Sequence, residues 1–199
     1  MEQNQAAGQS RSKLIHTVYD FVELFVIALC IVFVVFSFVA RFCRVSGPSM
    51  ENTLYDGEML LVSDLFYTPD AGDVIVFHQT SEQYANLNEL IVKRVIATEG
   101  QYVKVERDSV YVSDDASFEE SERLDENAYV HMDIGYMLDH FGVQGKVFTV
   151  PEGHLFVMGD NRNHSSDSRD PAIGFVDQRR VVGRVILRIT PLPRFGTVN

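Results

Sequence analysis

Apolar residues divide the 199-residue chain into two parts. Residues 21–40 form an almost uninterrupted apolar run, in which Glu23 is the only charged side chain. A helix of that length spans about 30 Å, which matches the hydrocarbon core of a bilayer. A buried core helix would show a polar face, and a secretion signal would have a shorter apolar centre. We therefore predict a transmembrane anchor over residues 20–41, with cleavage after residues 35–37 as the alternative.

After residue 45 the pattern changes to short apolar or alternating runs separated by turn residues, without a long helical period. Such runs are typical of β-strands. The predicted strands cover residues 59–62, 73–77, 90–97, 101–105, 110–112, 146–150, 155–158 and 180–189. We predict a mostly β fold, in which the transmembrane helix is followed by a partly closed β-barrel or two packed sheets.

This pattern gives three regions: a polar tail over residues 1–19, the anchor, and a β domain over residues 42–199. We expect the tail to be disordered. An acidic segment interrupts the β domain at about residues 113–145. Residues 114–126 of it hold seven acids and one arginine, a net charge of −6. The simplest interpretation of such a charge run is a solvated loop or insertion.

Composition excludes several classes of protein. The net charge of −11 argues against a nucleic-acid partner, because phosphate binding needs a basic face. Cys30 lies inside the apolar run and Cys43 just beyond it, so we predict no disulfide. The six histidines show no ligand spacing, and we predict neither a metal nor another cofactor.

The first candidate for chemistry is Ser49, in the stretch of residues 46–50. Gly47 and Pro48 are turn formers that hold the following serine on a stiff, exposed backbone. Such a position suits a nucleophile, although an ordinary turn serine is the alternative.

The second candidate is Lys93, on the predicted strand 90–97, where it shares a face with Ile91 and Val95. Burial on such a face lowers the pKa of a lysine, and a neutral amine beside a serine hydroxyl is a complete nucleophile–base pair. The alternative is that Lys93 extends to water at a strand edge.

A polar run over residues 159–169 follows the apolar strand at 155–158. It holds no aliphatic side chain and would ordinarily be a surface loop. Asp167 and Arg169 are spaced to form an ion pair that fixes this loop. A serine in the loop would then hydrogen-bond the lysine amine and aim it at Ser49.

These motifs, in this order, resemble those of type I signal peptidases. The resemblance covers about residues 20–110 and 146–196. Its motifs are Ser49-Met50 with Thr53-Leu54, Lys93-Arg94, Gly159-Asp160-Asn161-Arg162, Ser165 with Asp167-Ser168-Arg169, Gly183-Arg184-Val185 and residues 193–196. Two positions depart from the family pattern. Gly47 stands where some members have a serine whose hydroxyl helps to hold the oxyanion, which leaves Ser46 as the candidate second donor. Asn52 stands where proline is common.

The resemblance implies a role for each matched position. Ser49 would be the nucleophile and also an oxyanion donor through its backbone N–H, and Lys93 would be the general base. Ser165 would orient Lys93, the Asp167–Arg169 pair would support the loop, and Met50 would line the substrate pocket. Arg94, Asp160 and Gly47 belong to the same motifs as supporting residues.

The resemblance also implies a place and a substrate. The enzyme would be a serine endopeptidase that removes signal peptides from exported preproteins without a cofactor. It would cross the plasma membrane once, with the amino end in the cytoplasm and the catalytic domain outside. The flanking basic residues do not decide this orientation, because Arg11 and Lys13 on one side balance Arg41 and Arg44 on the other.

Two other functions fit the same residues. One is a membrane-tethered β domain that binds or assembles other proteins and holds an inactive serine–lysine pair. The other is a self-cleaving serine–lysine protease of the repressor type, against which the apolar anchor and the lack of a DNA-binding segment argue.

Overall fold

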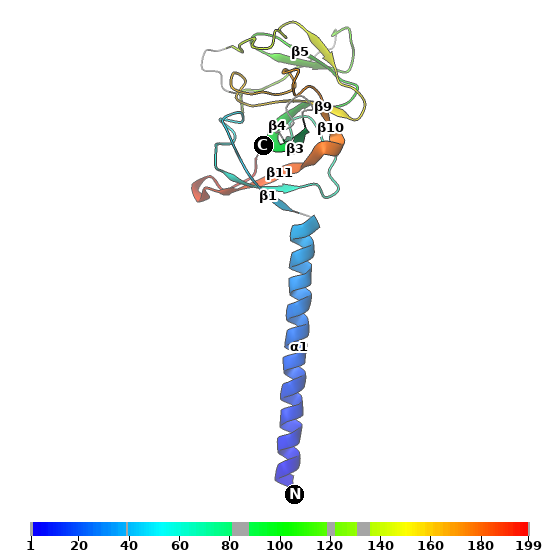
Figure 1. The fold of residues 1–199 in the computed structure, drawn as a ribbon, viewed down its shortest axis with the longest axis vertical. Coiled ribbons are helices and arrows are strands. Elements are labelled where there is room, and N and C mark those ends of the chain that lie inside the picture. The colour runs from blue at the N-terminus through cyan, green and yellow to red at the C-terminus, as the bar shows by residue number, and fades with distance from the viewer. Residues whose placement is uncertain (1, 39, 81–87, 119–121, 131–135, 199) are drawn as a thin grey trace. The chain divides into compact units, whose positions relative to one another are not determined.

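The computed structural model describes residues 2–38, 40–80, 88–118, 122–130 and 136–198 (Figure 1). The chain forms two compact units, Met1–Arg41 and Phe42–Asn199, which are described separately below. Residues 119–121 and 131–135 of the predicted acidic insertion lie outside the described residues.

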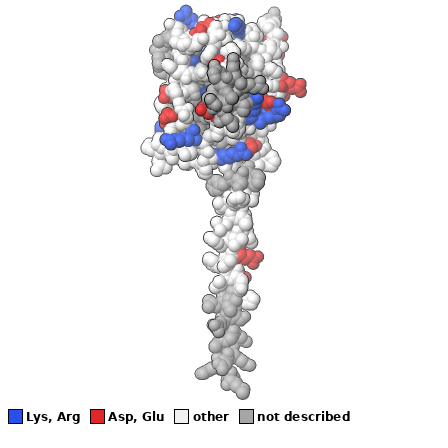
Figure 2. Space-filling model, viewed as in Figure 1, with Lys and Arg blue, Asp and Glu red and all other residues white. Residues whose placement is uncertain are grey.

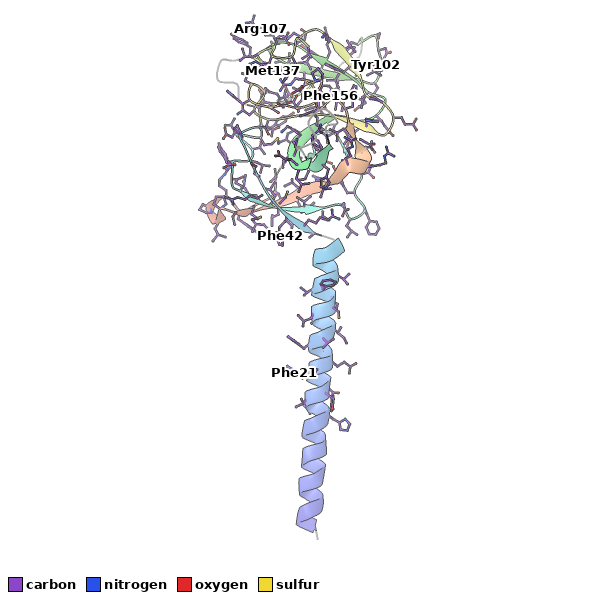
Figure 3. All side chains as sticks on the ribbon, in the orientation of Figure 1. Phe21, Phe42, Tyr102, Arg107, Met137 and Phe156 are labelled. Carbon is purple, nitrogen blue, oxygen red and sulfur yellow. The ribbon has the colours of Figure 1, made fainter. Side chains whose placement is uncertain are left out.

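The first unit is the single helix α1 (Glu2–Phe38). Its stretch His16–Val34 is long and apolar enough to cross a membrane, and none of it is buried against protein. Phe21, for example, is 75% exposed, and its side chain projects from the helix (Figure 3). In Figure 2 the only side chains coloured as charged along α1 are acidic. An apolar helix without protein cover is stable when lipid surrounds it.

The expectation of a disordered tail was wrong, because α1 already begins at Glu2. The tail has no proline, and its alanine, glutamine, lysine and arginine residues have high helix propensity. Extending an existing helix costs much less than nucleating a new one, so such residues continue the helix that the apolar run forms.

The second unit contains every strand that the sequence predicts, within a few residues at each end. These strands are β2 (Met59–Ser63), β3 (Val74–Thr80), β4 (Asn88–Ala97), β5 (Tyr102–Val105), β6 (Val110–Ser113), β8 (Val147–Thr149), β9 (His154–Met158) and β11 (Val181–Thr190). Three very short strands were not predicted: β1 (Arg41–Arg44), β7 (Glu122–Arg123) and β10 (Val176–Asp177). The 3₁₀ turns are η1 (Gln178–Arg180) and η2 (Leu192–Arg194).

The strands form two sheets, which confirms the mostly β, two-sheet prediction. The seven-stranded sheet has the order β1-β2-β11-β3-β4-β9-β10, and the four-stranded sheet has the order β7-β6-β5-β8. β11 lies between β2 and β3 and pairs antiparallel with both, through Val185 to Val62 and through Gly183 to Val76. A side chain at Gly183 would lie 2.5 Å from the carbonyl oxygen of Ser63. Glycine therefore allows the close approach of β11 and β2.

Three apolar clusters hold the domain together. Two of them include β4 residues of opposite faces, one with Val92 and the other with Val95. The third joins the ends of β4 and β9 to the four-stranded sheet and includes Met137 and Phe156, which are labelled in Figure 3. The strand that carries Lys93 is thus fixed by packing on both of its faces.

Candidate active site

Ser49 and Lys93 are in contact. Ser49 lies in the turn between β1 and β2, which is closed by hydrogen bonds from Glu51 N–H to Pro48 O and from Leu54 N–H to Met50 O. Lys93 lies on β4, and its Nζ is 2.7 Å from Ser49 Oγ. Nζ also donates to the carbonyl oxygen of Val92 at 3.0 Å, which fixes the direction of the amine. The arrangement brings a hydroxyl and an amine within proton-transfer distance.

The environment of Lys93 favours its neutral form. Its side chain is only 3% exposed, so the alternative in which it extends to water is wrong. Burial lowers the pKa of Lys93 to about 8, opposed by the charges of Asp167 and Asp160 and assisted by Arg169. A neutral amine can accept a proton, and a pKa near neutrality makes this form available under mild conditions.

Burying Lys93 has a cost that depends on pH. The pKa of Lys93 is about 8 in the folded protein, below the ordinary lysine value of 10.5, so the unfolded chain binds more protons between these two pH values. The cost is fully present below pH 8, about 3 kcal/mol from that difference, and disappears as the pH rises through 10.5.

Replacing Lys93 by methionine is therefore expected to stabilise the domain most at pH 7 and least near pH 10.5. Urea unfolding of the full chain in detergent at both pH values measures the difference in the free energy of unfolding. Lost hydrogen bonds at Ser49 and Val92 add an offset that the pH does not change. A stability difference that stays constant between the two pH values would contradict the prediction.

The polar loop after β9 packs directly against the Ser49 turn. Asn161 donates to Ser49 O from its backbone N–H at 3.1 Å and to Pro48 O from its side chain at 3.1 Å. At Gly159 an added Cβ would lie 2.4 Å from Ser49 O and 2.3 Å from Ser165 Oγ. The loop and the turn therefore touch backbone to backbone, and a displacement of one moves the other.

The ion pair expected inside this loop is formed. Arg169 binds both oxygens of Asp167, through Nε and Nη2 at 2.8 Å each, and both side chains are buried. Asp167 also accepts the N–H of Gly159 at 3.0 Å. Burial raises the pKa of Asp167, but the hydrogen bonds and charge of Arg169 outweigh it and hold the pKa below its usual value.

Ser165 is placed differently from the expectation. Its Oγ is buried and makes no hydrogen bond of full geometry to a described residue, but it lies near enough to Asp167 to help lower the pKa of that carboxyl. The bond expected between Ser165 and Lys93 is therefore not formed in this structure, and Val92 O holds the amine instead. Ser165 packs beside Gly159.

Arg94 and Asp160 connect the elements that carry the site. Arg94 binds both carboxylate oxygens of Asp160, at 2.9 and 2.8 Å, and donates to Gly72 O at 2.7 Å. Asp160 also accepts the hydroxyl of Thr53. The buried pair thus ties β4, the loop after β9 and the Ser49 turn to one another, and such a bidentate arrangement fixes geometry as well as charge.

Sequence reasoning missed two contributors, Glu126 and Tyr129, and gave no role to Arg162. Arg162 is buried and pairs with Glu126, and the ring of Tyr129 stacks on Arg94. Both partners belong to the acidic segment, to which the sequence assigned no chemistry. Within a run of acids one glutamate resembles the next, so only the need of a buried arginine for a counter-charge could have pointed to it.

Ser49 and Lys93 lie at a cleft of about 250 Å³. Residues from the turn, from β4 and from the loop region line it: Val45, Ser46, Gly47, Pro48, Ser49, Met50, Glu89, Leu90, Ile91, Val92, Lys93, Ser166 and Ile173. Most of these side chains are apolar. On the side away from β3, the described residues pair with β4 only from Arg94 onward, so its edge over residues 88–93 is free along the cleft.

Gly47 adopts a left-handed backbone with φ +84°, and its N–H donates to Asp56 Oδ1 at 2.9 Å. That donor is therefore not available to a substrate. Ser46 is exposed at the rim of the cleft. The N–H of Ser49 makes no hydrogen bond to any described residue. In the described ranges no group of three His, Cys, Asp or Glu side chains is placed to hold a metal ion.

Comparison with known proteins identifies the class. The family model described as signal peptidase, peptidase S26, matches residues 18–190. A probable signal peptidase I-1 of Synechocystis sp. is 33% identical over 184 residues, which cover 89% of this chain and 85% of that protein. A signal peptidase IB of Staphylococcus aureus is 34% identical over 178 residues, which cover 85% of this chain and 87% of that protein.

A signal peptidase I from Enterococcus faecalis, known from a crystal structure, matches this chain with 30% sequence identity and a TM-score of 0.43. The match covers 60% of this chain and 97% of that one. The matches in sequence define a serine endopeptidase. The chain belongs to the signal peptidase family, peptidase S26, which confirms the resemblance stated above.

Proposed function

We propose that Ser49 is the nucleophile and Lys93 the general base with which this signal peptidase removes signal peptides from exported preproteins. The observation that carries the proposal is the 2.7 Å contact between Ser49 Oγ and the buried Lys93 Nζ. A lysine with a pKa of about 8 can take the serine proton under mild conditions, which an exposed lysine cannot.

The reaction follows from this geometry. Ser49 Oγ attacks the scissile carbonyl while neutral Lys93 accepts its proton. The Ser49 N–H stabilises the oxyanion, and the Ser46 hydroxyl at the rim of the cleft is the candidate second donor. Protonated Lys93 then gives its proton to the leaving amine, which leaves an acyl-enzyme. Neutral Lys93 next activates a water molecule, and hydrolysis releases Ser49.

The cleft suits an extended peptide. The free edge of β4 offers backbone groups to a substrate strand, which is the β-augmentation mode of peptide binding. The apolar lining beside Ser49, with buried Met50, suits the small residues at positions −1 and −3 of a signal-peptide exit. Asp167–Arg169 and Arg94–Asp160 would support the site, and Ser165 would orient Lys93 only after a change of rotamer.

The anchor would place enzyme and substrate on one surface and so raise their effective concentration. We propose that α1 crosses the plasma membrane once, with its amino end in the cytoplasm and the catalytic domain outside. The apolar stretch His16–Val34 supports the crossing. Protease accessibility of the domain in sealed vesicles of known orientation tests the direction.

The pH dependence of cleavage tests the proposed pair. We expect kcat/KM of the detergent-solubilised protein on a preprotein to rise about tenfold per pH unit up to about pH 8 and then to level. Only the neutral amine accepts a proton, so kcat/KM rises rather than falls as the pH increases. The Ser49→Ala variant is the control and should show no cleavage.

Two outcomes would contradict the proposal. One is a midpoint near pH 10.5, the ordinary pKa of a free lysine. The other is full activity of Ser49→Ala. A folded protein that cleaves nothing at any pH would favour the membrane-tethered binding domain with an inactive pair.

A further inference from the structure

The acidic segment ends in a turn that reaches the supports of the site. The N–H groups of Tyr129 and Val130 both bond to the carbonyl oxygen of Glu126, at 3.1 and 2.8 Å. We call residues 126–130 the 126–130 turn. It follows β7, and it directs the carboxylate of Glu126 and the ring of Tyr129 at two buried arginines.

The first contact is that between Glu126 and Arg162. Glu126 Oε1 accepts from Arg162 Nη2, and the arginine side chain is 1% exposed. Arg162 Nε donates to Gly159 O at 3.1 Å, and its Nη1 is buried and has no partner among the described residues. Among the described residues, Glu126 is the one acid that forms a salt bridge with Arg162. Without it, this buried cation would lose its salt-bridge partner, which is strongly unfavourable.

The second contact is that between Tyr129 and Arg94. The ring centre of Tyr129 lies 4.0 Å from Arg94 Cζ, in the geometry of a cation–π interaction. Burial, and then the nearby charge of Glu126, raise the pKa of Tyr129 to about 12, so its hydroxyl stays neutral. Tyr129 thereby covers the Arg94–Asp160 pair from the side of the acidic segment.

Each of these two arginines is connected to one of the reacting groups through a single intervening contact or peptide bond. Arg94 is the neighbour of Lys93 on β4. Arg162 holds Gly159 O, and the Gly159 backbone touches Ser49 O without space for a methyl group. We propose that the 126–130 turn is a positioning device for this active site, in which Glu126 and Tyr129 hold Arg162 and Arg94 and thereby fix the separation of Ser49 and Lys93.

The proposal rests on the proposed function of Ser49 and Lys93. It makes Glu126 and Tyr129 positioning residues rather than catalytic ones, because neither contacts Ser49 or Lys93. The acidic segment is then not only a solvated loop. Its Glu126 balances the charge of buried Arg162, while neighbours such as Asp125 face solvent. Asp125 bonds only to Asn127 of its own loop among the described residues.

The test compares Glu126→Gln with the matched control Asp125→Asn, each in the full-length protein. Both remove one negative charge, from adjacent residues. We expect Glu126→Gln to lower kcat by about tenfold or more with KM within about twofold, because misplacing reacting groups affects the chemical step. Asp125→Asn is expected to keep both constants within about twofold of wild type.

A second readout separates positioning from general loss of structure. Glu126 lines a surface pocket of about 310 Å³, so a small carboxylate can reach Arg162 when the side chain is shortened. In Glu126→Ala, added acetate is expected to restore kcat in a saturable way, whereas chloride at equal ionic strength is not. Acetate should not restore Ser49→Ala.

Tyr129 gives an independent test that leaves no charge unpaired, in case Glu126→Gln does not fold. Tyr129→Ala is expected to lower kcat by about fivefold or more, whereas Tyr129→Phe keeps the ring face and stays near wild type. Equal kcat for the two variants would overturn the proposal. So would a folded Glu126→Gln with wild-type kcat, or a loss that lies in KM alone. An inactive wild type would instead refute the proposed function.

Discussion

Removing either member of the serine–lysine pair is expected to reduce kcat/KM by at least about 10³-fold while the domain stays folded. Ser49→Ala deletes the nucleophile. Lys93→Met keeps the length and apolar stem of the side chain but deletes the base that lies 2.7 Å from Ser49 Oγ. The remaining rate would come from substrate positioning and the oxyanion donors alone. Preprotein cleavage at pH 9 measures it.

Lys104→Met is the matched control for the lysine. Lys104 lies on β5, is partly exposed and pairs with Glu106, so its replacement should leave kcat/KM unchanged. The double variant Ser49→Ala with Lys93→Met should be no less active than either single variant, because groups that act as one unit are not additive. A Lys93→Met protein that keeps a tenth of the wild-type activity would refute the role of Lys93.

Gly159→Ala is expected to reduce kcat/KM by at least about 100-fold. The added methyl group would lie 2.4 Å from Ser49 O and 2.3 Å from Ser165 Oγ, closer than non-bonded atoms can approach. Ser165 can turn its side chain away. The carbonyl of Ser49 belongs to the backbone, so relief there moves the nucleophile relative to Lys93. The measurement is kcat/KM of the folded variant on the same preprotein.

Two further variants test whether the contact with Ser49 O causes the loss of activity in Gly159→Ala. Gly153→Ala introduces a methyl group where no atom lies within 4 Å but where φ is +70°, so it costs stability without touching the site. Its kcat/KM per folded molecule should match wild type. In Gly159→Ala with Ser165→Gly the contact with Ser49 O persists, and activity should stay low. Full recovery in that double variant would show that Ser165 alone caused the loss.

The sequence predicted those parts of the fold that local patterns determine. The apolar run of α1 and the alternation in strands such as β4 are visible without any knowledge of partners. β7 and β10 are only two residues long, and their pairing depends on β6 and β9, which no local pattern shows. The tail was misjudged because polar composition was given more weight than helix propensity next to an existing helix.

The site residues likewise fall into those that local patterns predict and those that depend on contacts between distant segments. Ser49 and Lys93 were predicted because a serine on a stiff turn suits a nucleophile, a lysine on an apolar strand suits a base, and the motif order linked them. Ser165 was assigned a partner that the structure does not give it, since rotamers depend on packing that sequence does not show. Glu126 escaped notice because its contact with Arg162 joins segments 36 residues apart.

The position of β11 in the seven-stranded sheet also sets when activity can begin. The Ser49 turn lies between β1 and β2, whereas Lys93 lies on β4 beside β3, and in this sheet β11 joins the two halves. β11 is the last strand along the described chain. During synthesis, β1–β2 and β3–β4 therefore cannot join into one sheet before β11 has been made. Such long-range pairing forms late. We therefore expect a chain that still lacks β11 to be inactive, and proteolysis to begin only when the sheet is complete.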